Sequence, residues 1–246
     1  MKRVLALDFD GVLCDTLDEC LITSINAYRK LSGNPARVSS LLEVKPDWVK
    51  WFRKNRPFVK PAGEYWIMAY WLHEEGGRLS GAEFEKLKCK HAATIEKFRP
   101  VFFEVRAELR NKDEQSWIAL HKPFSQAMEG LAGLSEQFDI YFVSNKDRDS
   151  IGVLCRHLGL EIPDSRILTG EKGKTKPEMI GEIVYERGMK AQDILFVDDQ
   201  LDHLFDVAET GAKCFWASWG YERDPKREHS FTRLKALREV ISYTKS

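Results

Sequence analysis

Short runs of apolar residues recur along the chain, and most are followed by a segment long enough for a helix. The runs predicted to be strands are residues 3–9, 140–143, 167–168, 194–197 and 214–216, and the helical segments between them are residues 147–158, 176–188 and 201–210. After a polar stretch at residues 222–228, an amphipathic pattern near 231–244 predicts a last helix that packs on the sheet. Apolar strands that alternate with helices are typical of a parallel sheet covered on both faces. The pattern therefore predicts an α/β fold.

The stretch between the first two predicted strands has a different pattern. In residues 16–120, strand-like alternation is scarce and aromatic residues recur at helical spacing. Thr16-Leu17-Asp18-Glu19 has the pattern of a capping box, which predicts that a helix begins there. We interpret the aromatic residues as a core rather than a ligand surface, because aromatic side chains bury large areas. The predicted organisation is a catalytic core made of residues 1–15 and 121–246, with a mostly helical domain, residues 16–120, inserted after the first strand.

The composition narrows the class of protein. Lys plus Arg and Asp plus Glu both number 38, so the chain lacks the basic excess of a nucleic-acid-binding protein. The apolar run at the N-terminus stops at Asp8, and no stretch approaches the roughly 18 apolar residues of a membrane span. We therefore expect a cytoplasmic protein with neither a nucleic-acid nor a membrane partner. The five cysteines are scattered and form no CxxC pair, which argues against disulfides and a zinc site.

Two clusters of carboxylates follow two of the predicted strands. Asp8-Phe9-Asp10-Gly11 ends the first strand, and residues two apart in extended chain point the same way. Asp198 and Asp199 end a later strand, with Asp202 close behind. The carboxyl ends of parallel strands lie at one edge of the sheet, where ligands bind. Like charges gathered there favour a cation between them, and oxygen ligands favour Mg²⁺.

Groups suited to phosphate oxygens lie between these clusters. Ser144 and Asn145 follow the strand at residues 140–143, and Lys176 precedes Pro177 at the mouth of a predicted helix. A hydroxyl and a lysine ammonium are suitable partners for phosphate oxygens. Lys174 is an alternative to Lys176 for this role.

Taken in order, these four segments resemble the four motifs of the haloacid dehalogenase superfamily, in particular its phosphoglycolate-phosphatase-like members with a helical cap. The resemblance implies a Rossmann-like core, with Asp8 as nucleophile and Asp10 as acid and base. It further implies Ser144 and Lys176 as catalytic and, with Asn145, phosphate-binding groups. Mg²⁺ would be held by Asp8, by the backbone carbonyl of Asp10 and by Asp199, assisted by Asp198 or Asp202. The substrate implied is a small phosphorylated metabolite.

Other assignments remain open at this stage. A sugar-phosphate mutase or a phosphonate hydrolase would use the same motifs, and a non-enzymatic binding protein could retain the fold. An acid at Asp10 favours phosphoryl transfer over dehalogenation, because an expelled halide needs no proton. Cys14 is weighed as a nucleophile and rejected, since no histidine is placed to activate it. Lys146 and Arg148 are candidates for contact with substrate, but a solvated helix start is expected instead, and His203 is expected on a helix surface.

Overall fold

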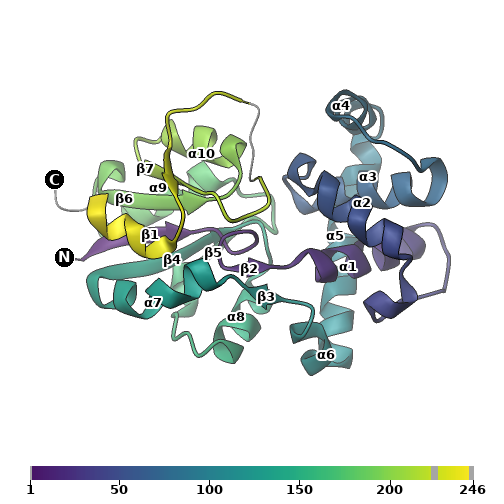
Figure 1. Cartoon of the computed structure of the whole chain (residues 1–246), viewed down its shortest axis with the longest axis horizontal. Coiled ribbons are helices and arrows are strands. Elements are labelled where there is room, and N and C mark those ends of the chain that lie inside the picture. Colours follow the sequence, from purple (N-terminus) through teal and green to yellow (C-terminus); the bar gives the residue numbers. More distant parts are fainter. Residues whose placement is uncertain (1, 223–226, 244–246) are drawn as a thin grey trace. The chain divides into compact units, whose positions relative to one another are not determined.

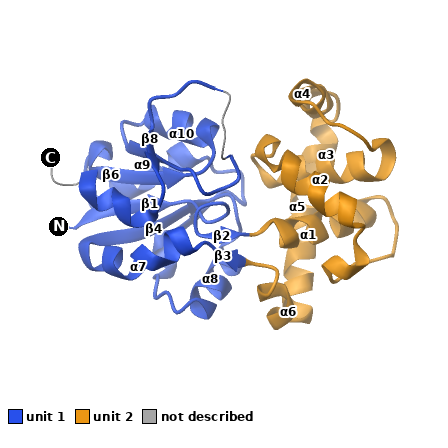
Figure 2. Cartoon of the chain, in the orientation of Figure 1, with its two compact units in different colours: residues 1–15, 122–246 blue, residues 16–121 orange. Residues whose placement is uncertain are grey.

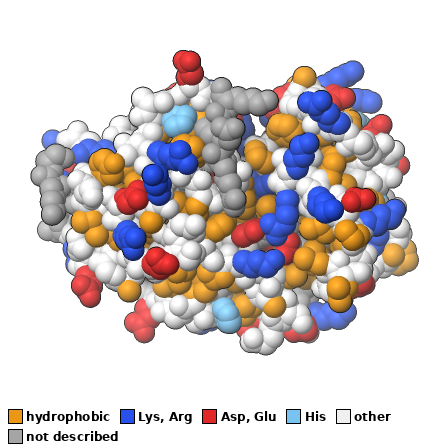
Figure 3. Space-filling model, in the orientation of Figure 1, with side chains coloured by type: hydrophobic (Ala, Val, Ile, Leu, Met, Phe, Trp, Pro, Cys, Tyr) orange, Lys and Arg blue, Asp and Glu red, His pale blue; other side chains and the backbone are white. Residues whose placement is uncertain are grey.

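The computed structural model describes residues 2–222 and 227–243, and the chain divides into two compact units (Figure 2). Unit 1 comprises Met1–Asp15 with Lys122–Ser246, and unit 2 comprises Thr16–His121. Within the described residues, no helix is both long enough and apolar enough to cross a membrane. On the face drawn in Figure 3, positive and negative side chains lie intermixed over the surface of each unit, in keeping with the equal totals of 38.

Unit 1 is built on a six-stranded sheet in which every neighbouring pair of strands is parallel, in the order β5-β4-β1-β6-β7-β8. The strands are β1 Arg3–Leu7, β4 Phe138–Ser144, β5 Ile167–Thr169, β6 Ile194–Asp198, β7 Lys213–Ala217 and β8 Thr232–Leu234. The helices are α7 Ser125–Gln137, α8 Arg148–His157, α9 Lys176–Arg187 and α10 Leu201–Ala208. Figure 1 shows α9 and α10 on one side of the sheet and α7 and α8 on the other. The predicted α/β class is confirmed.

Apolar residues face both sides of the sheet, as expected for central parallel strands. Val4 and Ala6 of β1 belong to the core that packs under α9 and α10, whereas Leu5 and Leu7 are buried on the opposite side. Because β1 lies between β4 and β6, the order of the strands reverses at β1. Ligands of open α/β sheets bind outside the carboxyl ends of the strands at such a switch point. The fold therefore singles out the residues just after β1.

The helix predicted for the C-terminal segment is wrong. The residues near 231–244 do not form one amphipathic helix: β8 adds a parallel strand to the edge of the sheet, with Phe215 opposite Thr232, and Leu237–Tyr243 is a 3-10 helix. The strand was not predicted because only Leu234 of its three residues is buried, whereas the equally short edge strand β5 has two buried apolar residues. Part of the polar stretch at residues 222–228 lies outside the described residues.

The chain leaves unit 1 and returns to it through a short ribbon. β2 Cys14–Asp15 pairs antiparallel with β3 Lys122–Pro123, with Cys14 opposite Pro123 and Asp15 opposite Lys122. Hydrogen bonding between the outgoing and returning segments fixes both ends of the insertion at one place in unit 1.

Unit 2 is helical. Its α-helices are α1 Leu17–Leu31, α2 Pro46–Asn55, α3 Tyr65–Tyr70, α4 Gly81–Lys90, α5 Ala92–Lys112 and α6 Glu114–Ile118. A π-helical turn, Trp71–Glu75, and 3-10 turns at Leu41–Glu43, Arg56–Phe58 and Ala62–Glu64 connect them. Tyr65 lies between Phe52 and Phe102, with ring centroids 5.7 and 5.1 Å away. These three rings are buried, which agrees with their interpretation as core.

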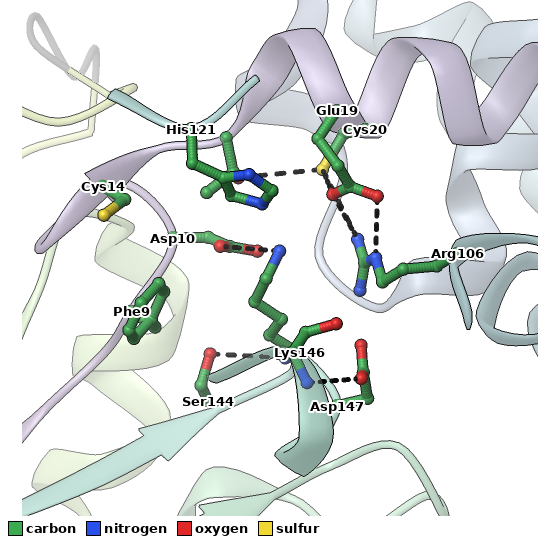
Figure 4. A network of polar contacts seen from close by, with 12 residues as sticks. Phe9, Asp10, Cys14, Glu19, Cys20, Arg106, His121, Ser144, Lys146 and Asp147 are labelled. Atoms are coloured by element: carbon green, nitrogen blue, oxygen red, sulfur yellow. Dashed lines mark hydrogen bonds and ion pairs between the residues drawn. The ribbon is translucent and has the colours of Figure 1, made fainter. Parts of the chain in front are cut away.

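The capping box predicted at the start of α1 does not form. The side chain of Thr16 makes no capping hydrogen bond in the described structure. Glu19 instead accepts two hydrogen bonds from the Arg106 guanidinium, at 2.9 and 3.0 Å (Figure 4). It also accepts one from the Thr23 hydroxyl at 2.6 Å. Glu19 is 0% exposed and Arg106 2%. A bidentate bond from a buried arginine is stronger than a backbone cap, so α1 is joined to α5 through this ion pair.

Candidate active site

The register of the sheet gathers the predicted site residues at one edge. Leu7 of β1 lies opposite Phe142 of β4 and opposite Val197 of β6. Asp8 follows Leu7 directly, and its amide donates to the carbonyl of Val197 at 3.0 Å. Ser144 ends β4 and Asp198 ends β6, so both flank the residues that follow β1. The site residues predicted at the ends of separate strands are therefore neighbours in the structure.

A buried chain of charges starts at Asp8. The Lys176 ammonium lies 2.8 Å from Asp8 Oδ2 and 2.6 Å from Asp198 Oδ2, and it is 3% exposed. His203 Nδ1 lies 3.3 Å from Asp198 Oδ2. Lys176 is the first residue of α9, where the Thr175 side chain and Glu178 form a capping box. The capping box fixes the start of the helix, and thereby the lysine that bridges the two carboxylates.

The surroundings shift the pKa values of Asp8, Asp198 and Lys176 in different directions. Burial raises the pKa of Asp8 above its ordinary value, with the charge of Asp198 adding to the effect and Lys176 opposing it. Burial also opposes ionisation of Asp198, but Lys176 and His203 outweigh it and hold the pKa of Asp198 below its usual range. For Lys176, burial lowers the pKa, yet the two carboxylates more than compensate, so its pKa lies above the ordinary value. Lys176 is therefore a fixed positive charge, and Asp8 gains from any further cation nearby.

Asp199 is held by the segment after β7. The amide of Tyr221 donates to Asp199 Oδ2 at 2.6 Å. The carboxylate lies so close to the turn after β1 that a Cβ placed on Gly11 would be 2.5 Å from Asp199 Oδ1. A Cβ on Gly220 would be 2.2 Å from the Asp199 Cβ and 2.5 Å from the carbonyl oxygen of Gly11. Only glycine at both positions allows Asp199 and the turn to approach this closely.

The turn that carries Asp10 is tight and cross-braced. Gly11 has φ of +89°, a conformation that favours glycine, and its amide donates to the carbonyl of Cys14 at 2.9 Å. The indole Nε1 of Trp219 donates to the carbonyl of Val12 at 2.9 Å, from more than 200 residues away in the sequence. These contacts leave the backbone after Asp10 little freedom, as positioned catalytic groups require.

Asp10 faces a lysine that the sequence analysis placed in solvent. The Lys146 ammonium lies 3.4 Å from Asp10 Oδ1, and the lysine side chain is 0% exposed (Figure 4). The prediction of a solvated helix start is therefore wrong for Lys146. Its backbone amide donates to the Ser144 hydroxyl at 3.3 Å, so the two residues are also linked locally. The sequence favoured exposure of Lys146 over contact with substrate, because a lysine after a strand is ordinarily exposed.

The carboxylates fit a divalent cation. Ligand atoms of Asp8, Asp198 and His203 lie within 4.8 Å of one another, but the Lys176 ammonium already bridges the two carboxylates of that group. Asp199 Oδ1 lies close to Gly11, the residue that follows Asp10, since a Cβ placed on Gly11 would be 2.5 Å from it. The carboxylate oxygens of Asp8 and Asp199 form an all-oxygen donor set, which suits a hard cation.

The remaining predicted residues lie in different places. Asn145 lies beside Gly170, where a Cβ would be 2.5 Å from its Oδ1. Lys174 is 40% exposed and pairs with Glu182, so it does not compete with Lys176. The side chain of Asp202 is 41% exposed and forms an ion pair at 3.1 Å with Arg227, which is also exposed.

Two further side chains were judged from the sequence alone. His203 is 8% exposed and contacts Asp198, so its assignment to a helix surface is wrong. It lies five residues after Asp198, and only the turn between β6 and α10 brings the two together. Burial raises the pKa of the Cys14 thiol to about 12, with Asp10 adding to the effect, which leaves it protonated and agrees with its rejection as a nucleophile.

Comparisons with known proteins agree with this geometry. A predicted phosphoglycolate phosphatase from Haemophilus somnus 129PT is 15% identical, with a TM-score of 0.63 over 99% of this chain and 98% of that one. A predicted phosphatase from Clostridium acetobutylicum is 14% identical, with a TM-score of 0.63 over 99% and 98%. The defluorinating L-2-haloacid dehalogenase Rha0230 is 12% identical, with a TM-score of 0.54 over 100% and 96%. At such identities the likeness concerns the fold alone.

The sequence itself carries the assignment to a family. No curated protein matches the chain significantly. The family model described as "Hydrolase: haloacid dehalogenase-like hydrolase" matches residues 2–204, which include all four motifs. The resemblance inferred from those motifs is confirmed, and this hydrolase belongs to the haloacid dehalogenase-like family.

Proposed function

We propose that this hydrolase is a Mg²⁺-dependent phosphatase that cleaves a small phosphomonoester through a phosphorylated Asp8. The observation that carries the proposal is the position of Asp8 at the end of the central strand, with the Lys176 ammonium 2.8 Å away. A second carboxylate, Asp10, follows two residues later on a braced turn. A nucleophile, a fixed cation and a separate proton carrier are the groups that phosphoryl transfer requires.

In the first step, a carboxylate oxygen of Asp8 attacks phosphorus and the bond to the ester oxygen breaks. The departing oxygen takes a proton from Asp10 and leaves as an alcohol. In the second step, water attacks the phosphorus of the aspartyl-phosphate and gives its proton to Asp10, which regenerates Asp8 and releases phosphate. Positioned proton transfer of this kind contributes about 10²–10⁴-fold to the rate. Lys176 and the Ser144 hydroxyl bind the phosphate oxygens in both steps, with Asn145 beside them.

Charge explains why the cation belongs to this site. Ionised Asp8, Asp198 and Asp199 lie with Lys176 in an interior where the first three are 6%, 0% and 1% exposed. A phosphate dianion adds further negative charge, which the lysine alone does not balance. Asp8, the Asp10 carbonyl and Asp199 would hold Mg²⁺, and Asp198 supports the site through Lys176. When bound, the cation neutralises charge on the phosphate and the nucleophile. We also propose that residues 16–121 are the cap domain of the family and select the organic part of the ester.

The proposal is tested with a screen of small phosphomonoesters, with Mg²⁺ and with EDTA, on wild type, Asp8→Asn and Asp206→Asn. Asp206 is an exposed carboxylate of α10 and serves as the matched control. We expect Mg²⁺-dependent release of phosphate by wild type and by Asp206→Asn, and none by Asp8→Asn. Activity that survives Asp8→Asn or EDTA would refute the mechanism. Transfer of phosphate back to a sugar, or cleavage of phosphonates only, would instead identify a mutase or a phosphonate hydrolase.

Trapping the nucleophile gives an independent measurement. Beryllofluoride mimics a phosphoryl group on a carboxylate, so wild type should bind it in the presence of Mg²⁺ and Asp8→Asn should not. Binding that persists in Asp8→Asn would place the acceptor on another residue.

A further inference from the structure

Lys146 is a buried ammonium that the proposed mechanism does not use. Its side chain is 0% exposed, although lysine is among the residue types least often buried. A buried ammonium is tolerated only where a counter-charge or hydrogen bonds compensate for lost water. The structure places the carboxylate of Asp10 3.4 Å from it. A side chain in so costly a position next to a reacting group calls for a role.

The contact involves one particular oxygen of Asp10. Asp10 Oδ1 is shielded from solvent and has no hydrogen-bond partner among the described residues, so the Lys146 ammonium is the positive group that the structure places beside it. The Asp10 side chain as a whole keeps 15% of its surface exposed. That exposure lies on atoms other than Oδ1. The two oxygens of the carboxylate therefore lie in different surroundings.

The backbone holds Lys146 rigidly. Lys146 is the second residue after β4, which ends at Ser144, and its amide donates to the Ser144 hydroxyl at 3.3 Å. The next residue, Asp147, caps α8 by accepting from the amide of Ser150 at 2.9 Å. A lysine fixed between a strand end and a helix cap presents its ammonium at a defined place.

We propose that Lys146 is a positioning residue for proton transfer. Its ammonium holds Oδ1 of Asp10, so that Oδ2 is the oxygen that gives the proton to the departing ester oxygen and later takes one from water. The proposal rests on the phosphatase function proposed above. It adds a second lysine to the site, with a task different from that of Lys176, which pairs with the nucleophile.

The test compares two esters of similar size that differ in their need for a proton. p-Nitrophenolate departs as an anion, whereas the benzyloxy oxygen must be protonated as it departs and leaves as benzyl alcohol. In Lys146→Met, we expect kcat/KM for benzyl phosphate to fall by about 10²-fold or more, and kcat/KM for p-nitrophenyl phosphate to fall by less than about tenfold. Because kcat/KM covers only the steps up to departure of the alcohol, slower hydrolysis of phosphorylated Asp8 does not hide this difference.

The second step gives a separate signature. If Asp10 is misplaced, water attacks phosphorylated Asp8 slowly while p-nitrophenolate still leaves quickly. Rapid mixing of Lys146→Met with p-nitrophenyl phosphate should then show a burst of p-nitrophenolate close to the enzyme concentration. In an Asp10→Asn background, Lys146→Met should cause no further loss with benzyl phosphate, because both changes remove the same function.

Controls separate the ways in which the proposal can fail. Lys190→Met, at an exposed lysine, should match wild type on both esters. If Lys146→Met does not fold, Lys146→Gln, which keeps a polar end without the charge, replaces it in the same comparison. Equal losses on the two esters, or none on either, would overturn the role of Lys146 while leaving the phosphatase intact. Failure of the phosphatase itself appears separately, as wild-type activity that is absent or that survives Asp8→Asn.

Discussion

A methyl group added at position 220 should disturb the site more than any feature of the sequence suggests. The Cβ of an alanine would be 2.2 Å from the Asp199 Cβ, 2.5 Å from the Gly11 oxygen and 2.6 Å from Asp199 Oδ2. Carbon atoms in contact lie about 3.5–4.0 Å apart, so something must move by roughly 1.3 Å or more. Asp199 directly follows the central strand β6 and is 1% exposed, which leaves the segment after β7 to give way.

That movement has a calculable cost. It stretches the bond from the Tyr221 amide to Asp199 at 2.6 Å and the bond from the Trp219 indole to Val12 at 2.9 Å. Overpacking costs about 1–3 kcal/mol, and each hydrogen bond contributes about 1 kcal/mol. We therefore expect Gly220→Ala to lower the free energy of unfolding by about 3–5 kcal/mol. Loss of the bond that holds Asp199, a Mg²⁺ ligand in the function proposed above, should also lower kcat/KM by about 10²-fold.

Two assays on the same preparations measure the two effects. Guanidinium unfolding gives the free energy, and Mg²⁺-dependent hydrolysis of p-nitrophenyl phosphate gives kcat/KM. Gly133→Ala in α7 is the matched control, since a Cβ there meets nothing within 4 Å, and it should stabilise the helix by about 0.5–1 kcal/mol without affecting activity. If Gly220→Ala is as stable and active as Gly133→Ala, the close approach of Asp199 to the two glycines is not a requirement of the site.

Three further outcomes follow from buried charges and thiols. Arg106→Met leaves Glu19 buried without its counter-charge and should destabilise the protein by about 3–5 kcal/mol in urea unfolding. The control Arg99→Met removes a partly exposed ion pair and should cost at most about 1 kcal/mol. Equal losses would show that the buried pair has no special role. The pKa of Asp198 in the folded protein lies below its ordinary value, so ionised Asp198 stabilises the fold above the unfolded pKa, and this stabilisation is lost as the pH falls through the folded pKa. The difference in unfolding free energy between wild type and Asp198→Asn should therefore shrink from about pH 7 toward strongly acid pH. A difference that stays constant would contradict the lowered pKa. Iodoacetamide at about pH 8 should label Cys89 first in the folded protein, as peptide mass spectrometry would show, since the other cysteines are buried or half-buried; earlier labelling elsewhere would contradict the burial.

The sheet was predictable from the sequence because its central strands are buried on both faces. A run such as Ile194–Asp198 must be apolar along nearly its whole length, and the short runs before and after it obey the same constraint. β8 escapes the pattern because only Leu234 of its three residues is buried, so no apolar run marks it. The capping box expected at Thr16 failed for a different reason: Glu19 has the right spacing, but a buried arginine 87 residues away binds it instead. Local signals hold only where no stronger distant partner exists.

The candidate site likewise contains residues that the sequence identifies and contacts that it does not. Asp8, Asp10 and Asp198 were found because they follow apolar strands directly, and strand ends meet at one edge of a parallel sheet. The residues that contact these carboxylates could not be predicted from the sequence, since those contacts depend on the conformation of turns. The hydrogen bond to Asp199 comes from a residue 22 positions later, and the cation beside Asp10 comes from the loop after β4.

The two lysines of the site show what the three-dimensional structure adds to a motif. Lys176 could be singled out because it opens a helix next to a proline, and it pairs with Asp8 and Asp198. Lys146 has no such signal, and its importance rests entirely on its burial and on the 3.4 Å to Asp10. In the function proposed above, one ammonium serves the carboxylate that attacks phosphorus, and the other the carboxylate that moves the proton. Because the two carboxylates are only two residues apart, separate cations at the start of α9 and in the loop after β4 are a means of giving them different tasks in one pocket.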